Sequence, residues 1–213
     1  ATGLAMARPV LDVWVVGGDG DMLSIGGNHL IHAMRRNIDL TILLFNNQNY
    51  GLTKGQYSPT SELGKITKST PMGSLDEPFN PVSVALGAEA TFVARTHDID
   101  RKHMQATFKR AHEHKGSALV EIFQNCNVFN DGAFDMITKK DKRDTMLIQL
   151  EHGEPIRFGV DNEMGVISNT EGSAEIVKVA DVGEDALLIH DETRQDPSVA
   201  FAISRLASGP YEP

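Results

Sequence analysis

The fold is decided by the stretch Val13-Trp14-Val15-Val16-Gly17-Gly18-Asp19-Gly20-Asp21, in which an apolar run is followed at once by glycines and carboxylates. A continuous apolar run of this kind is typical of a strand buried in a parallel sheet, and the glycines predict a tight turn into a helix. A second apolar run, residues 40–45, ends in Asn46-Asn47. Because ligands bind beyond the carboxyl ends of parallel strands, we expect Asp19 and Asn47 to form a site there for a divalent cation and a diphosphate.

Strands and helices alternate up to about residue 123, which predicts an α/β fold with a doubly wound parallel sheet. The rest of the chain predicts an irregular β-rich extension, so the expected domains are residues 1–137 and 138–213. The expected strands are residues 13–16, 40–45, 91–94 and 117–123, then 145–150, 155–159, 165–168, 175–179 and 186–190. The expected helices are residues 22–36, 81–90, a helix capped by Asp98 or Asp100 that ends near Lys115, and 198–206, with a long loop over residues 46–80.

The composition limits the classes of partner. A net charge of −9 argues against a surface for nucleic acid or anionic membrane, and the sequence has no apolar run long enough to span a bilayer. Cys126 is the only cysteine among the 213 residues, which excludes an intrachain disulfide and favours a cytoplasmic location.

The glycines after the first strand have several interpretations. A dinucleotide fingerprint needs a glycine where Leu23 stands, and a phosphate-binding P-loop needs a Gly-Lys-Ser/Thr that is absent. A calcium-binding EF-hand loop would need a residue with an oxygen ligand at position 23 and a glycine at position 24, where this chain has Leu23 and Ser24. For Gly18-Asp19-Gly20-Asp21 taken alone, an ordinary strand-to-helix turn remains an open alternative.

The asparagines after the second strand favour a cation site. Mg²⁺ prefers oxygen ligands in octahedral geometry and usually takes one or two of them from protein. Asp19 offers a carboxylate, Asn47 an amide oxygen and Asn49 a backbone carbonyl. The expected helix points its N-terminus at the same place, and the small Gly18 and Gly20 let backbone N–H groups approach a phosphate.

Longer strings carry a family resemblance. Gly18-Asp19-Gly20-Asp21 followed by Asn46-Asn47 resembles the thiamine diphosphate motif of thiamine enzymes. Residues 20–29 (Gly-Asp-Met-Leu-Ser-Ile-Gly-Gly-Asn-His) and 49–60 (Asn-Tyr-Gly-Leu-Thr-Lys-Gly-Gln-Tyr-Ser-Pro-Thr) resemble the beta subunit of 2-oxoacid:ferredoxin oxidoreductases, of the 2-oxoglutarate type. Residues 121–126 (Glu-Ile-Phe-Gln-Asn-Cys) and 129–134 are similar to the same family. The resemblance covers essentially the whole chain, most strongly residues 13–134.

The resemblance implies roles for individual residues. Asp19, Asn47 and the Asn49 carbonyl would hold Mg²⁺. The residues expected to line the diphosphate are Gly18, Gly20, Asp21, Gly51, Leu52 and Thr53. Lys54 and Gln56 would lie near the substrate or coenzyme A, and a lysine there suits the second carboxylate of 2-oxoglutarate. A solvated loop lysine is the alternative for Lys54.

Cys126 has two interpretations. Composition alone favours a small buried hydrophobe, whereas the resemblance implies one of four ligands to a [4Fe-4S] cluster. Such a cluster needs four thiolates, so the resemblance predicts that the other three lie upstream and that this chain is truncated at its N-terminus.

The activity that the resemblance implies is the decarboxylation of 2-oxoglutarate to succinyl-coenzyme A, with electrons passed to ferredoxin. An alpha subunit would supply the glutamate that activates thiamine diphosphate, so no general base or other catalytic residue is assigned to this chain. Two alternatives stay open: a pyruvate-type or other thiamine diphosphate enzyme, and a non-catalytic interaction module that keeps the fold.

Overall fold

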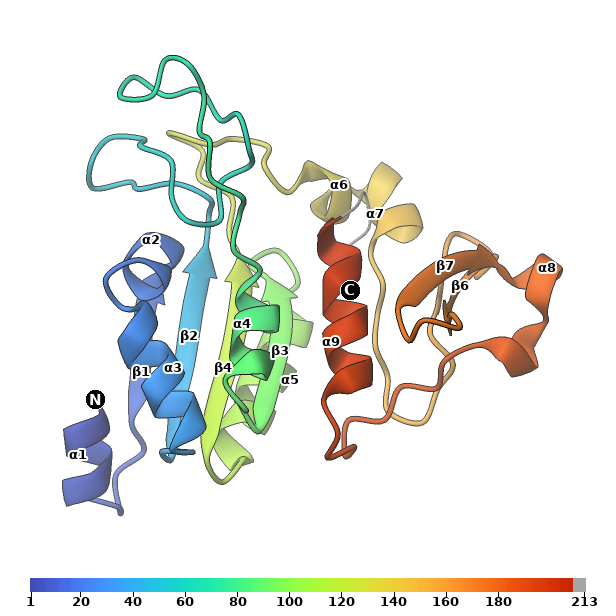
Figure 1. Ribbon diagram of the computed structural model, residues 1–213, viewed down its shortest axis with the longest axis horizontal. Helices are drawn as coiled ribbons and strands as arrows, with labels where there is room; N and C mark the ends of the chain where they lie inside the picture. The colour runs from blue at the N-terminus through green and yellow to red at the C-terminus, as the bar shows by residue number, and fades with distance from the viewer. Residues whose placement is uncertain (209–213) are drawn as a thin grey trace. The chain divides into compact units, whose positions relative to one another are not determined.

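The computed structural model describes residues 1–208, and the chain divides into two compact units, Ala1–Phe134 and Asp135–Pro213 (Figure 1). The first unit contains a four-stranded sheet in which all neighbours are parallel and the strand order is β1-β2-β4-β3. This sheet confirms the predicted α/β fold. Its strands are β1 (Trp14–Gly18), β2 (Leu40–Asn46), β3 (Phe92–His97) and β4 (Ser117–Phe123).

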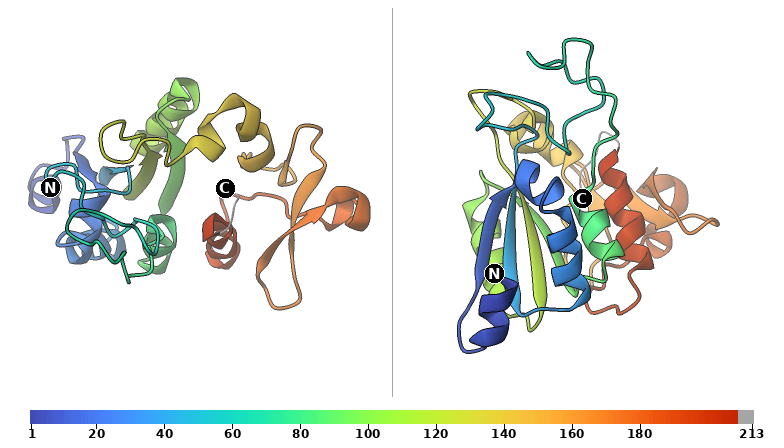
Figure 2. Two further views of the ribbon diagram at one scale, coloured as in Figure 1. Left: turned by 90° about the horizontal axis from the view of Figure 1, so that it is seen from above. Right: turned by 60° about the vertical axis from the view of Figure 1, so that its left-hand side comes forward.

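Helices cover both faces of this sheet, and alternate residues of each central strand enter two separate cores. On one face α3 (Gly27–Arg35) and α4 (Pro81–Gly87) pack on Ile42, Leu44 and Leu119. On the other face α5 (Arg101–Glu113) packs on Leu43, Val120 and Ile122. Figure 2 shows helices on both faces of the sheet. Burial on both faces explains why β2 and β4 are apolar along nearly their whole length. A short helix, α1 (Thr2–Ala7), precedes β1.

The single helix predicted for residues 22–36 is wrong, because the chain forms two helices there. The first, α2 (Asp19–Leu23), begins at the carboxylate itself, and the second is α3. The Gly26 N–H donates to the Asp21 carbonyl at 2.8 Å. A Cβ on Gly26 would lie 2.5 Å from that carbonyl oxygen, so only glycine permits this turn.

Two other boundaries differ from expectation. The strand predicted for residues 91–94 continues to His97 in β3, because Arg95 is opposite Glu121 of β4 and pairs with it inside the sheet. The helix predicted to reach Lys115 ends at Glu113, while its predicted cap Asp100 accepts a hydrogen bond from the His103 N–H at 3.0 Å. The connection over residues 47–80 has isolated bridges and turns but, in this fully described segment, no helix or longer strand.

The second unit has an antiparallel three-stranded sheet of β5 (Arg157–Phe158), β6 (Met164–Ser168) and β7 (Ala174–Lys178). Its core contains Ile148, Ile156, Phe158, Val166 and Ile203. Its remaining elements are α6 (Asp135–Thr138), α7 (Lys140–Met146), α8 (Val179–Val182), a 3₁₀ turn η1 (Glu184–Ala186), α9 (Ser198–Ser204) and a second 3₁₀ turn η2 (Arg205–Ser208).

Two strands predicted for this unit are wrong. Residues 145–150 were expected to form a strand, but α7 extends to Met146 and Ile148 enters the core from an irregular segment. Residues 186–190 form only an isolated bridge, from Pro155 to Ile189, after the turn η1. Both predictions failed because a short apolar run does not distinguish a strand from other buried backbone.

The units divide between Phe134 and Asp135, slightly before the predicted boundary at residue 137. Phe134 stacks on Phe123 of β4 with ring centroids 4.5 Å apart, whereas Asp135 begins α6. Among the described residues, no helix combines the length and apolar character needed to cross a membrane.

Candidate functional site

Asp19 lies at the carboxyl end of β1 and is almost completely buried, with 1% of its surface exposed. Its Oδ2 accepts hydrogen bonds from the hydroxyls of Ser58 at 2.5 Å and Thr60 at 2.6 Å. Its Oδ1 accepts a longer bond, 3.4 Å, from the Asn47 N–H. Burial raises the pKa of the Asp19 carboxyl above its usual value, although these hydrogen bonds act in the opposite direction. A desolvated carboxylate held by neutral donors is suited to bind a cation.

Three candidate ligands converge beside Asp19. One atom of the Asn47 side-chain amide lies 3.3 Å from Asp19 Oδ1 and 3.0 Å from the Asn49 carbonyl oxygen. If this atom is the amide nitrogen, Asn47 donates hydrogen bonds to both oxygens. If it is the amide oxygen, three hydrogen-bond acceptors face one another with no proton between them. Octahedral Mg²⁺ with bonds of about 2.1 Å separates adjacent ligands by about 3.0 Å. Both distances from the Asn47 amide are close to this separation, so the three oxygen-bearing groups remain candidate Mg²⁺ ligands when the amide oxygen occupies that position.

The Asn49 side chain stabilises the backbone turn over residues 47–49. Its amide nitrogen donates to the Asn47 carbonyl at 3.0 Å and to the Asn47 side-chain oxygen at 3.1 Å. Its Oδ1 is buried, and no donor within residues 1–208 forms a hydrogen bond with it. A buried acceptor without a partner is unusual in a folded protein and often marks a ligand or water position.

The residues expected to line a diphosphate are in two places. Gly18 ends β1, Gly20 and Asp21 belong to α2, and the Tyr50 hydroxyl donates to the Gly20 carbonyl at 2.9 Å. Gly51, Leu52 and Thr53 are exposed on a tight loop closed by the bridge between Tyr50 and Gln56. Leu52 is 98% exposed at the tip of this loop.

Lys54 and Gln56 lie on the same loop, and both are exposed. Lys54 has a φ of 64°, an uncommon value for a residue other than glycine, and its N–H donates to the Gly51 carbonyl at 3.0 Å. The loop is anchored at its other end, where a Cβ on Gly55 would lie 2.9 Å from the Phe129 ring. The structure thus holds Asp19, Asn47 and Asn49 together, and presents Lys54 and Gln56 on the neighbouring loop.

Cys126 follows β4 and is partly buried. Burial alone would raise the pKa of its thiol, but the N–H groups of Phe129, Val128 and Asn130 and the side chain of Asn49 together lower it. Several N–H donors around one sulfur stabilise the thiolate, which is the form that binds iron. Asn49 contacts both the predicted cation ligands and this sulfur.

The sequence did not predict all residues of the site. Ser58 and Thr60, which hold Asp19, lie in a loop without periodicity. The buried Glu121 accepts hydrogen bonds from Asn46 at 2.7 Å and Arg95 at 2.8 Å. Its signal was visible, since Glu121 is the only charge within the apolar run of β4.

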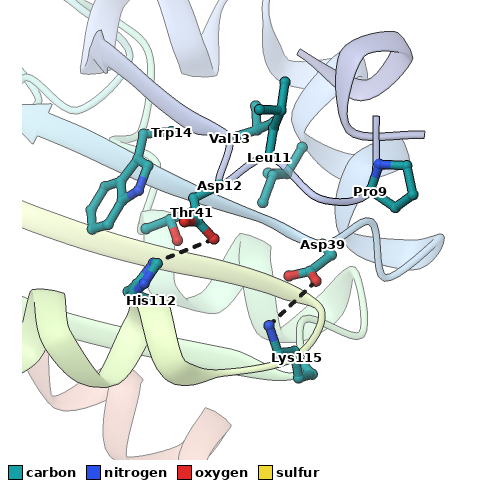
Figure 3. A pocket seen from close by; sticks show the side chains of 10 residues that line it. Pro9, Leu11, Asp12, Val13, Trp14, Asp39, Thr41, His112 and Lys115 are labelled. Carbon is teal, nitrogen blue, oxygen red and sulfur yellow. Dashed lines mark ion pairs between the residues drawn. The ribbon is translucent and has the colours of Figure 1, made fainter. Parts of the chain in front are cut away.

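A small pocket lies at the opposite, amino-terminal edge of the sheet (Figure 3). Two ion pairs border it, Asp12 with His112 at 4.0 Å and Asp39 with Lys115 at 3.9 Å. The pocket contains none of the predicted site residues.

Comparison with known proteins defines the class. The family model described as "Thiamine pyrophosphate enzyme, C-terminal TPP binding domain" matches residues 1–122. Together with the parallel sheet and the site at its carboxyl edge, this match places the chain among the thiamine pyrophosphate enzymes.

Several relatives narrow the family. The 2-oxoglutarate oxidoreductase subunit KorB of Mycobacterium tuberculosis is 61% identical over 207 residues, 97% of this chain and 55% of that protein. The 2-oxoacid:ferredoxin oxidoreductase subunit beta of Saccharolobus solfataricus is 47% identical over 131 residues, 62% of this chain and 43% of that protein. The chain spans about half the length of the curated relatives it matches.

A solved structure agrees with these relatives. It is a 2-oxoglutarate:ferredoxin oxidoreductase from Magnetococcus marinus with 2-oxoglutarate, coenzyme A and succinyl-CoA bound. It matches with a TM-score of 0.64 and 44% identity, over 71% of this chain and 51% of that one. The chain therefore belongs to the thiamine pyrophosphate enzyme family whose model it matches, and it is similar to beta subunits of the 2-oxoacid:ferredoxin oxidoreductases, which confirms the predicted resemblance.

Proposed function

We propose that this chain is the diphosphate- and metal-binding part of a 2-oxoglutarate:ferredoxin oxidoreductase. The reaction converts 2-oxoglutarate and coenzyme A to succinyl-coenzyme A and CO₂, and passes two electrons to ferredoxin. The observation that carries this proposal is the position of the Asn47 side-chain amide, which lies 3.3 Å from Asp19 Oδ1 and 3.0 Å from the Asn49 carbonyl oxygen. When bound, thiamine diphosphate supplies the nucleophile and the electron sink for decarboxylation.

The residues of this chain bind and orient rather than transfer protons. Asp19, Asn47 and Asn49 hold Mg²⁺, which fixes the diphosphate on the protein. Gly18, Gly20 and Asp21 on one side, and Gly51, Leu52 and Thr53 on the other, line the diphosphate. Gly20 is suited to this position because a Cβ there would lie 2.3 Å from the Tyr50 ring.

Cys126 provides one ligand to a [4Fe-4S] cluster whose other three thiolates come from outside the 213 residues, since the sequence has no second cysteine. The N–H groups that lower the pKa of Cys126 favour the thiolate there. When bound, such a cluster would supply the one-electron transfer needed to reduce ferredoxin.

The remaining components come from partners. An alpha subunit completes the thiamine site and supplies the activating glutamate, and the second unit, from Asp135 onward, forms subunit contacts. Lys54 and Gln56 contact 2-oxoglutarate or coenzyme A from their exposed loop. A cytoplasmic location agrees with the single unpaired cysteine. This assignment involves neither nucleic acid nor a membrane.

The test uses the assembled enzyme and compares Asp19→Ala with Asp39→Ala, an exposed carboxylate at the opposite sheet edge. We expect Asp19→Ala to lose Mn²⁺ binding, measured by electron paramagnetic resonance, and thiamine diphosphate binding, measured by calorimetry. Asp39→Ala should keep both. Absence of Mn²⁺ and thiamine diphosphate binding in all three proteins would instead support a non-catalytic module, whereas wild-type binding by Asp19→Ala would overturn the assignment of Asp19 as a metal ligand.

Substrate choice is a separate measurement. We expect a higher kcat/KM for 2-oxoglutarate than for pyruvate in the same assembled enzyme. A preference for pyruvate would assign the chain to a pyruvate-type oxidoreductase.

A further inference from the structure

A line of buried polar groups crosses the sheet at its carboxyl edge and ends at the candidate cation site. Arg95 of β3 donates through Nε to Glu121 Oε2 at 2.8 Å, and the side chain of Glu121 is 0% exposed. The other oxygen, Glu121 Oε1, accepts a hydrogen bond from Asn46 Nδ2 of β2 at 2.7 Å. The Glu121 carboxylate therefore accepts hydrogen bonds from the Arg95 guanidinium on one neighbouring strand and from the Asn46 amide on the other.

Asn46 lies between Glu121 and two parts of the candidate cation site: the turn that carries Asn47 and Asn49, and the Thr60 hydroxyl beside Asp19. Its Oδ1 accepts a hydrogen bond from the Gln48 N–H at 3.2 Å, which closes the turn that carries Asn47 and Asn49. Gln48 has a φ of 55°, so this turn is held in a conformation that a residue other than glycine rarely adopts. Asn46 Oδ1 is also a second acceptor for the Thr60 hydroxyl, at 2.9 Å, so Asn46 and Asp19 compete for the single proton of this hydroxyl.

Thr60 connects the line to the carboxylate. Its hydroxyl is 2.6 Å from Asp19 Oδ2, on the side of the carboxylate opposite the asparagine ligands. Asn46 is thus within hydrogen-bond distance of the group that holds Asp19 and of the backbone that shapes the other two ligands.

We propose that Glu121 is a positioning residue for the cation site and acts through the amide of Asn46; this inference rests on the proposed function. A carboxylate can only accept hydrogen bonds, so it holds Asn46 with its nitrogen toward Glu121 and its oxygen toward Gln48 and Thr60. Without that acceptor the amide can rotate and place a donor against the Gln48 N–H. The turn then loses its support and the three ligands separate.

The alternative is that Glu121 and Arg95 form a structural ion pair only. A buried ion pair contributes little net stability compared with apolar side chains of similar size, so the pair can be replaced without loss of the fold. Two replacements then separate the roles. Arg95→Leu/Glu121→Leu removes the ion pair and the acceptor for Asn46. Arg95→Gln/Glu121→Gln removes the same charges but leaves an amide oxygen for Asn46.

The experiment measures Mn²⁺ affinity in the presence of thiamine diphosphate, by electron paramagnetic resonance of the assembled enzyme, after thermal unfolding has shown that each variant folds. We expect the leucine pair to bind Mn²⁺ roughly 10- to 100-fold more weakly, as is common when an outer hydrogen-bond partner of a metal ligand is lost. The glutamine pair should restore affinity close to that of the wild type. If the leucine pair does not fold, Arg95→Met/Glu121→Met replaces it in the same comparison.

Two results would overturn the proposal: wild-type affinity in the leucine pair, or equal weakening in both pairs. Asp19→Ala is measured alongside. If Asp19→Ala binds Mn²⁺ as well as the wild type, it is the assignment of the metal ligands that fails rather than the role of Glu121.

Discussion

Replacing Gly20 with alanine tests how closely the fold and the cation site are joined. A Cβ on Gly20 would lie 2.3 Å from Tyr50 Cε1 and 2.5 Å from Cδ1, well inside van der Waals contact. The Tyr50 ring must therefore move, and its hydrogen bond to the Gly20 carbonyl, 2.9 Å long, is lost with it. Tyr50 is adjacent to Asn49, so the displacement also moves a predicted cation ligand.

The magnitude follows from these contacts. Overpacking in a filled site costs about 1–3 kcal/mol, and the lost hydrogen bond adds about 0.5–1.5 kcal/mol. Gly20 lies in α2, where alanine is favoured over glycine by about 0.5–1 kcal/mol, which offsets part of the loss. We expect a net decrease of about 0.5–4 kcal/mol in the free energy of unfolding and roughly tenfold weaker Mn²⁺ binding.

The assays are chemical denaturation and Mn²⁺ titration of the assembled enzyme. Gly27→Ala is the matched control, because a Cβ there meets no atom within 4 Å and the residue also lies at the start of a helix. Tyr50→Ala combined with Gly20→Ala should recover part of the packing loss, since the clash is then absent. If Gly20→Ala is no less stable than Gly27→Ala, the reasoning about Tyr50 is refuted.

Further predictions concern the cap of α5, the sulfur of Cys126 and the exposed loop. The His103 N–H lowers the pKa of Asp100, so Asp100 stabilises the protein above the usual pKa of 3.8 and loses this effect as the pH falls through its lowered pKa. Asp100→Ala should therefore cost about 1 kcal/mol at pH 7 in thermal unfolding, and this cost should decrease as the pH falls below 3.8; a cost that does not change with pH would contradict this. Asn49→Ala keeps the carbonyl but removes a donor to Cys126, so the cluster potential in a redox titration should fall by roughly 40 mV, and an unchanged or higher potential would count against it. Lys54→Ala should raise KM for 2-oxoglutarate and leave Mn²⁺ affinity unchanged; a change confined to kcat would argue against a binding role.

The strands of the first unit and the positions of the candidate cation ligands were predictable because both depend on local sequence. The apolar runs of β1 and β2 are continuous, and the polar groups directly after them must lie where parallel strands end. Asp19, Asn47 and Asn49 were predicted as cation ligands in this way, and the structure places Asn47 beside both of the others. The break between α2 and α3 was missed, because the apolar spacing of residues 22–36 fits one helix and the close approach of Gly26 to Asp21 is visible only in three dimensions.

The supporting groups could not be predicted, because they depend on strand order and on an irregular loop. Alternating strands and helices predict a parallel sheet, but they do not place β4 between β2 and β3. Only that order puts Glu121 opposite Arg95 and within reach of Asn46. Likewise, Ser58 and Thr60 reach Asp19 only because the connection over residues 47–80 returns to the sheet edge. The candidate ligands therefore come from local sequence, whereas their geometry depends on contacts between distant segments. If the proposed function holds, variants such as Arg95→Leu/Glu121→Leu should weaken cation binding without changing any candidate ligand.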